Sequence, residues 1–260
     1  MGIIKQSIST NVFSTIIKNL ENRWGLTLVS FLAPKAQKEI EAIQSKLFDC
    51  CNVVCPVPRD ERGGHSLKLY DLSNLHCTHL TLKRSNPCSP IKKKDFLKPG
   101  AELFELYDIL NEVISELSSF EGVLDNFKIM QNGIELILFG QCSKNVDIEN
   151  RCVLLSKLME HLPIHFNLDP RKYEQDSSQF HKLHCSIGYV KRPQLINSKK
   201  FTKIVESLKF PPIAIKMEEI HLVHYRYRSL SYPQEGIVTF EIGRKSLLNK
   251  DEFAKKINIQ

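Results

Sequence analysis

Hydrophobic residues alternate with polar ones in some segments of the chain and recur every three to four residues in others. Alternation is typical of strands with one buried face, and the longer spacing is typical of amphipathic helices. The alternating segments predict strands at residues 24–32, 66–70, 75–83, 126–130, 134–139, 182–190, 219–228 and 236–243. The longer spacing predicts helices at residues 34–47, 103–117, 148–161 and 198–208, with a further helix in residues 1–20.

The order of these elements predicts an α+β fold with mainly antiparallel sheets, because several consecutive strands are joined by short connections. The clearest connection is Gln131-Asn132-Gly133, where Asn-Gly tolerates the positive φ angles that tight hairpins require. No strand is followed by a glycine-rich phosphate loop, so the Walker and dinucleotide-binding folds are excluded. A chain of 260 residues can form one domain or two small lobes.

The composition is that of an ordinary globular protein, with 42% hydrophobic and 25% charged residues. Its formal net charge of +7 suits an anionic partner such as a nucleotide or RNA, although a solvated basic surface would give the same value. No apolar run approaches the ~20 residues of a membrane helix. The chain has eight cysteines and no recognisable signal peptide, so we expect a cytoplasmic protein without disulfides. We also expect a monomer. The spacing of Cys50, Cys51 and Cys55 does not fit a zinc site, and we expect no metal and no cofactor.

One short motif occurs twice. The segment Leu75–Leu82 reads LHCTHLTL and the segment Leu183–Ile187 reads LHCSI. Residues two apart on a strand share a face, so His184 and Ser186 should lie together, with Leu183, Cys185 and Ile187 forming the buried back. Cys185 is then expected to be a buried apolar residue and not a nucleophile.

The first copy of the motif allows two registers. His76-Cys77-Thr78 matches the second copy almost letter for letter, and His79-Leu80-Thr81-Leu82 has the same order of histidine, apolar residue, hydroxyl and apolar residue. Alternation favours the second register, because its back would consist of Thr78, Leu80 and Leu82. The first register would instead bury Cys77, His79 and Thr81. We therefore predict His79 and Thr81 as the functional couple and keep His76 as the alternative.

Two imidazoles and two hydroxyls that converge on one point are suited to phosphodiester chemistry. One histidine can accept a proton from the attacking hydroxyl or water while the other protonates the leaving oxygen, since imidazole titrates near neutral pH. Thr81 and Ser186 can donate hydrogen bonds to the phosphate oxygens. His79 and His184 would then be the catalytic pair, and no metal is required.

These two motifs resemble those of the 2H phosphoesterase superfamily, in which histidine, an apolar residue, threonine or serine and another apolar residue recur twice. The resemblance rests on His79-Leu80-Thr81-Leu82 and His184-Cys185-Ser186-Ile187. It implies a bilobal fold of two mainly antiparallel sheets with outer helices flanking a central groove. One motif would come from residues 21–120 and the other from residues 121–250. It also implies a phosphodiesterase acting on cyclic or 2′,5′-linked nucleotides or on RNA ends. The alternative is a nucleotide-binding or RNA-binding module of the same fold without catalysis.

Further candidate substrate contacts lie near the motif strands. Lys83 follows the first motif, and Tyr189 and Arg192 follow the second. In the segment Tyr225-Arg226-Tyr227-Arg228, alternation places the tyrosines on one face and the arginines on the other, so either pair could contact a nucleotide. Tyrosines packed inward with solvated arginines are the simpler interpretation.

Overall fold

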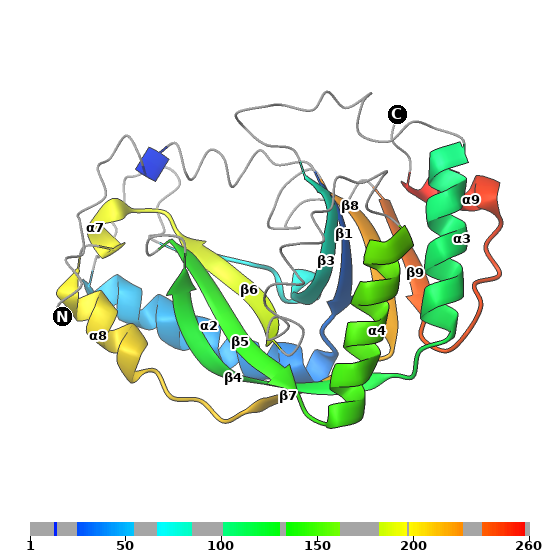
Figure 1. Cartoon of the computed structure of the whole chain (residues 1–260). Coiled ribbons are helices and arrows are strands. Elements are labelled where there is room, and N and C mark those ends of the chain that lie inside the picture. The colour runs from blue at the N-terminus through cyan, green and yellow to red at the C-terminus, as the bar shows by residue number, and fades with distance from the viewer. Residues whose placement is uncertain are drawn as a thin grey trace.

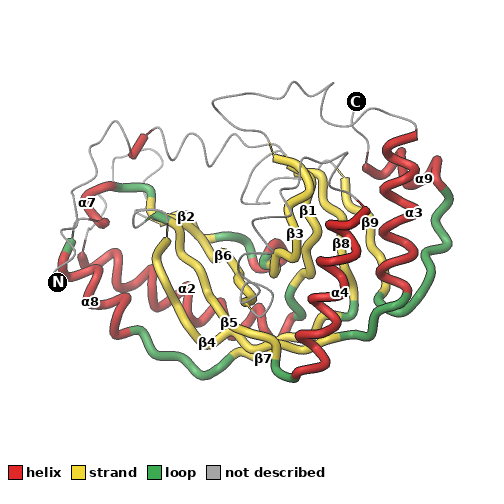
Figure 2. The backbone as a smooth tube through the Cα atoms, viewed as in Figure 1, coloured by secondary structure: helices red, strands yellow, loops and turns green. Residues whose placement is uncertain are grey.

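The structure is a computed structural model that describes residues 13–14, 25–54, 67–84, 101–130, 134–161, 182–196, 198–225 and 236–257. Within these ranges the fold is a mixed α/β fold with one strongly curled antiparallel sheet and six α-helices (Figures 1 and 2). The strands are β1 (Gly25–Phe31), β2 (Leu67–Leu69), β3 (His76–Arg84), β4 (Phe120–Met130), β5 (Glu135–Cys142), β6 (Lys182–Val190), β7 (Ile213–Met217), β8 (Glu219–Tyr225) and β9 (Gly236–Glu241). The helices are α2 (Pro34–Val54), α3 (Ala101–Ser115), α4 (Asn145–His161), α7 (Pro193–Ile196), α8 (Lys199–Ser207) and α9 (Lys250–Ile257), with a 3-10 turn, η1, at Leu72–Asn74.

The two strands that carry the motifs lie in the middle of the sheet. The strand order is β7-β4-β5-β6-β3-β1-β8-β9, with β2 paired to β6. The sequence predicted two sheets, but β3 and β6 are paired through Cys77 and Cys185 and so join all described strands into one. Strands β8 and β9, from the C-terminal half of the chain, extend the sheet from β1.

The helices cover one face of the sheet. Helix α2 packs against α8, β2 and β7, and α3 and α9 pack against β9 at the other end of the sheet (Figure 1). Helix α4 packs against β4, β5 and α3. Their apolar side chains, such as Ile40, Leu110 and Phe253, form one core with Leu28 and Leu80 of the sheet. We call the sheet face that carries this core the helix-covered face. The opposite face, whose apolar cluster contains no residue of a described helix, is called the helix-free face. The hydrophobic effect explains this division, because alternate residues of each strand point to opposite faces.

The sequence predicted most of these elements. The strand at 182–190 and the helices α3, α4 and α8 are confirmed within three residues at their ends, whereas α2 begins as predicted and ends seven residues later, at Val54. Strand β4 begins six residues earlier than predicted, at Phe120, and β7 and α9 were missed. The expected helix at residues 1–20 lies outside the described residues apart from residues 13–14. No described helix combines the length and apolar character needed to cross a membrane.

Candidate functional site

The pairing of the two motif strands fixes which residues face each other. Cys77 on β3 lies opposite Cys185 on β6, and neither side chain is exposed to solvent. Residues directly opposite each other in a sheet share a face, so this pair belongs to the helix-covered face. Because the strands are antiparallel, Thr78, the residue after Cys77, lies opposite His184, the residue before Cys185. In the same way His76 lies opposite Ser186. These four residues share the helix-free face, and all four are partly exposed.

A β-bulge on β3 changes which residues of the first motif lie on the helix-free face. Val29 pairs with Thr78 and Leu28 pairs with Leu80, so His79 is an extra residue opposite β1. An inserted residue breaks the alternation of faces along a strand. His79 is therefore buried with Leu80, whereas Thr78, which alternation had assigned to the buried back, is partly exposed. This corrects the alternation argument, and the couple on the helix-free face beside His184 is His76 and Thr78.

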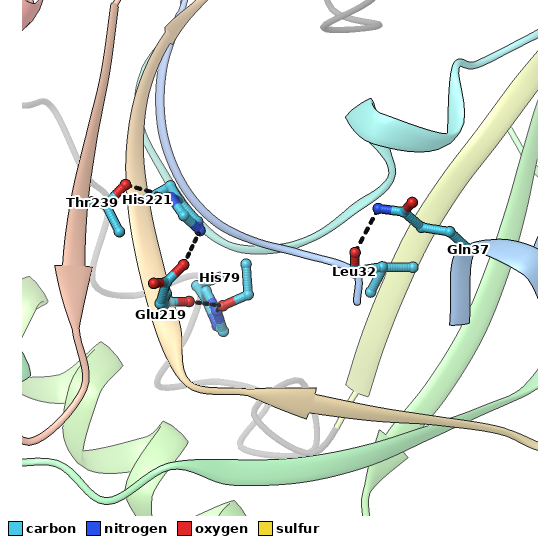
Figure 3. Close-up of polar contacts among 7 residues, drawn as sticks. Leu32, Gln37, His79, Glu219, His221 and Thr239 are labelled. Atoms are coloured by element: carbon cyan, nitrogen blue, oxygen red, sulfur yellow. Dashed lines mark hydrogen bonds and ion pairs between the residues drawn. The ribbon is translucent and has the colours of Figure 1, made fainter. Parts of the chain in front are cut away.

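His79 takes part in a buried hydrogen-bond chain on the helix-covered face. The Ser30 hydroxyl donates to the carbonyl oxygen of Glu219 at 2.6 Å, so it accepts the proton of His79 Nε2 at 2.8 Å (Figure 3). Nδ1 of His79 is then unprotonated, and it has no hydrogen-bond partner among the described residues. Burial, followed by the charge of Arg151 and of nearby histidines, holds the pKa of His79 well below its ordinary value. This environment keeps His79 neutral and away from solvent.

His76 is held by the turn that precedes its strand. Its Nδ1 lies 2.7 Å from the carbonyl oxygen of Asn74, the last residue of η1. A carbonyl can only accept, so Nδ1 carries the proton and Nε2 is the basic nitrogen. Burial lowers the pKa of His76, and the hydrogen bond to Asn74 offsets part of this shift. His76 is therefore a neutral imidazole near pH 7, with a fixed tautomer.

The second motif is flanked by side chains of β5. The ring of Phe139 lies 6.5 Å from the imidazole of His184. Ser186 Oγ donates a hydrogen bond to Oε1 of Glu135 at 3.1 Å, and Glu135 is only 2% exposed. Sequence reasoning missed Glu135, although a lone carboxylate within the apolar run of residues 134–139 was an available signal.

A further histidine lies on the helix-free face next to the motif residues. His221 on β8 pairs with Val29, which pairs in turn with Thr78. Its Nδ1 lies 3.0 Å from Oγ1 of Thr239, and its Nε2 lies 3.5 Å from a carboxylate oxygen of Glu219 (Figure 3). Burial lowers the pKa of His221 to about 4. Sequence reasoning missed His221 as a neighbour of the motif residues.

The thiols of the motif strands are structural. Burial raises the pKa of Cys77 to about 12 and raises that of Cys185 well above its ordinary value. Both thiols therefore stay protonated at neutral pH, and Cys185 is the buried apolar residue that the sequence predicted. Among the described residues, no three side chains from His, Cys, Asp and Glu are grouped so that they could hold a metal ion.

The remaining predicted contacts fall in different environments. Thr81 pairs with Thr27, is partly exposed and shares the helix-free face with Thr78. Tyr189 is buried and its ring packs 6.2 Å from that of Tyr70, so it is a packing residue. Arg192 is partly exposed just beyond the end of β6.

Tyr225 is buried in a small apolar cluster with Val29 and Val223. The backbone of Lys83 belongs to β3, but its side chain lies outside the described part of the structure. Arg226, Tyr227 and Arg228 lie outside the described residues altogether.

Comparisons with known proteins found similarity to solved structures only. No protein-family model and no curated protein matches the chain. The solved structure of TT0787 from Thermus thermophilus has 16% sequence identity and a TM-score of 0.48, covering 85% of this chain and 100% of that one. ATU0111 of Agrobacterium tumefaciens, a conserved protein of unknown function, has 12% identity and a TM-score of 0.48 over 85% and 86% of the two chains. E. coli LigT in complex with 3′-AMP has 13% identity and a TM-score of 0.41 over 85% and 95%. No activity is transferred from such distant structures.

Proposed function

We propose that this protein is a metal-independent phosphodiesterase of the 2H type, with His76 and His184 as the catalytic pair. The observation that supports this proposal is the pairing of Cys77 on β3 with Cys185 on β6. By strand alternation, the His-x-hydroxyl couples that flank these two cysteines then share the opposite face. His76 and His184 are diagonal neighbours across the two strands, a relation that typically separates Cα atoms by about 7–8 Å. A phosphate group fits between two imidazoles at that separation.

The roles that we assign to the two histidines follow from the fixed tautomer of His76. His76 is neutral, with Nδ1–H held by Asn74, so Nε2 accepts the proton of the attacking water or ribose hydroxyl. The new P–O bond forms as the bond to the leaving oxygen breaks, and His184, in its protonated form, donates a proton to that oxygen. After this step His76 is protonated and His184 is neutral. Proton exchange with solvent restores both states, as does hydrolysis of a cyclic product when the ribose hydroxyl is the attacking group.

The two hydroxyl groups hold the phosphate. Thr78 and Ser186 donate hydrogen bonds to the non-bridging oxygens, on which charge increases in the transition state. Ser186 exchanges its present hydrogen bond to Glu135 for one to the phosphate.

The substrates that we propose are cyclic or 2′,5′-linked nucleotides or RNA ends, in line with the net charge of +7. The test is a turnover assay on 2′,3′-cyclic nucleotides, 2′,5′-oligoadenylates, 3′,5′-cyclic dinucleotides and short RNAs, with the regiochemistry of each product determined. We expect turnover of at least one diester, and a loss of at least about 100-fold in kcat for His184→Gln.

Thr78→Val and Ser186→Ala provide the matched test of phosphate binding. Each removes one hydroxyl and keeps both histidines, so each should lower kcat by roughly 10- to 1000-fold with an unchanged fold. Tight nucleotide binding without turnover of any diester would contradict the catalytic proposal and favour the nucleotide-binding or RNA-binding module.

A further inference from the structure

Each histidine of the proposed pair has a phenylalanine beside it on the neighbouring strand. Phe31 on β1 lies directly opposite His76, and their rings are 6.1 Å apart in an edge-on arrangement. Phe139 on β5 lies directly opposite His184, with the rings 6.5 Å apart at an angle of 37°. Both phenylalanines are partly exposed on the helix-free face. The same local arrangement therefore occurs on both sides of the motif.

The strand order places these rings on opposite sides of the proposed phosphate position. The sequence of strands β5-β6-β3-β1 puts the motif strands in the middle and the two phenylalanine strands outside them. Across the sheet the order of side chains is Phe139, His184, His76 and Phe31. Adjacent strands are about 4.8 Å apart, so a flat sheet would separate the outer two strands by roughly 14 Å. A phosphate and its two ester groups fit between the rings.

The surroundings of the rings suit a planar anionic ligand. The ammonium group of Lys128 lies 5.7 Å from the centre of the Phe139 ring, and Lys128 is itself exposed. A flexible, solvated lysine over that ring is readily displaced by a base and then remains near the phosphate. Phe31 packs 4.8 Å from the imidazole of His221, which fixes the orientation of this ring.

We propose that Phe31 and Phe139 are two stacking platforms, and that the substrate is an internucleotide phosphodiester with a nucleobase on each side of the scissile phosphate. This inference rests on the proposed function and narrows it. Aromatic rings bind nucleobases by stacking with little dependence on sequence. A 2′,3′-cyclic mononucleotide has one base and can use only one of the two rings. The site should therefore favour a linear dinucleotide over a cyclic mononucleotide.

The test combines removal of a phenylalanine ring from the protein with removal of a base from the substrate. The substrates are 2′,5′- and 3′,5′-linked adenylyl-adenosine and two half-substrates, in which a methyl group replaces one nucleoside or the other. For the linkage that is hydrolysed, kcat/KM is measured for the wild type, Phe31→Ala and Phe139→Ala. Val153→Ala, an exposed apolar truncation on α4, is the matched control. Circular dichroism and thermal unfolding show whether each variant is folded.

Stacking contributions predict that removing either base lowers the wild-type kcat/KM by roughly 5- to 150-fold. Each Phe→Ala variant should lose a similar factor on the dinucleotide and lose nothing further when the base that its own ring binds is removed. The loss caused by Phe31→Ala should disappear on one half-substrate, and the loss caused by Phe139→Ala should disappear on the other. Phe→Trp at either position should restore the dinucleotide preference, which a purely structural role would not produce.

The inference is overturned if each phenylalanine variant loses the same factor on all substrates, or loses nothing, while the wild type still hydrolyses diesters. That result leaves the proposed function intact. If the wild type hydrolyses none of the diesters, the proposed function fails, and calorimetric titration of wild type and variants with the same compounds decides the inference. Equal affinity for the dinucleotide and both half-substrates would then refute it.

Discussion

The burial of His221 makes the stability of this protein depend on pH. The folded pKa of this histidine is about 4, against about 6.5 in an unfolded chain. Below pH 6.5 the unfolded state takes up a proton that the folded state excludes, so stability falls as the pH falls from about 6.5 to about 4. The carboxylate of Glu219, 3.5 Å from Nε2, is half exposed and too well solvated to offset the burial.

The expected size follows from this pKa difference. Each pH unit in this window is worth about 1.36 kcal/mol, so at pH 5 the excluded proton costs about 2 kcal/mol relative to pH 7. Replacement of His221 by glutamine removes the titrating group. The decrease in unfolding free energy between pH 7 and pH 5 should therefore be about 2 kcal/mol smaller in His221→Gln than in the wild type, whatever the variant's stability at pH 7.

Urea unfolding at pH 7 and pH 5 measures this difference. Thr239→Val is the matched control, because it removes the hydroxyl beside Nδ1 but keeps the buried imidazole. Its decrease between the two pH values should match that of the wild type to within about 0.5 kcal/mol. An equal decrease in the wild type and in His221→Gln would refute the claim that burial excludes the proton.

Three further predictions concern the fold and the site. Ser30→Ala should lower the unfolding free energy by about 1–3 kcal/mol in urea unfolding, because it leaves the buried His79 Nε2–H without its acceptor; no change would mean that this hydrogen bond is not formed. Gly140→Ala should also destabilise the protein, by about 1–3 kcal/mol, because a Cβ there would lie 1.8 Å from the carbonyl oxygen of Val123; wild-type stability would rule out this close approach of β4 and β5. Diester turnover should be unchanged after treatment with EDTA, because the two imidazoles carry the proton transfers; loss of activity that added metal restores would contradict the metal-independent mechanism.

The second motif was predictable from the sequence because its strand is regular there. Leu183, Cys185 and Ile187 are fully buried, and His184 and Ser186 are partly exposed, as the alternation predicted. The helices with long apolar stripes were equally clear. Strand β7 and helix α9 were missed because they are short, with five and eight residues, and such lengths contain too few periods to stand out.

The first motif could not be assigned from alternation alone. The bulge at His79 depends on how β3 pairs with β1, which is a long-range property. The positions of Glu135, Phe139 and Phe31 beside the motif residues likewise follow from the registers of β5 and β1. The local sequence around each of these three residues does not indicate which residue lies beside it on the neighbouring strand. That information comes only from the pairing of the strands.

The most direct test of the central claim compares glutamine substitutions at His76 and His79. Both substitutions make the same chemical change, and the amide of glutamine can still donate to Ser30 in place of His79. The claim that His76 faces the same site as His184 predicts that His76→Gln lowers kcat on the preferred diester by at least about 100-fold, whereas His79→Gln stays within about tenfold of the wild type and mainly lowers the unfolding temperature. A large loss of kcat in folded His79→Gln, with His76→Gln near wild type, would contradict it.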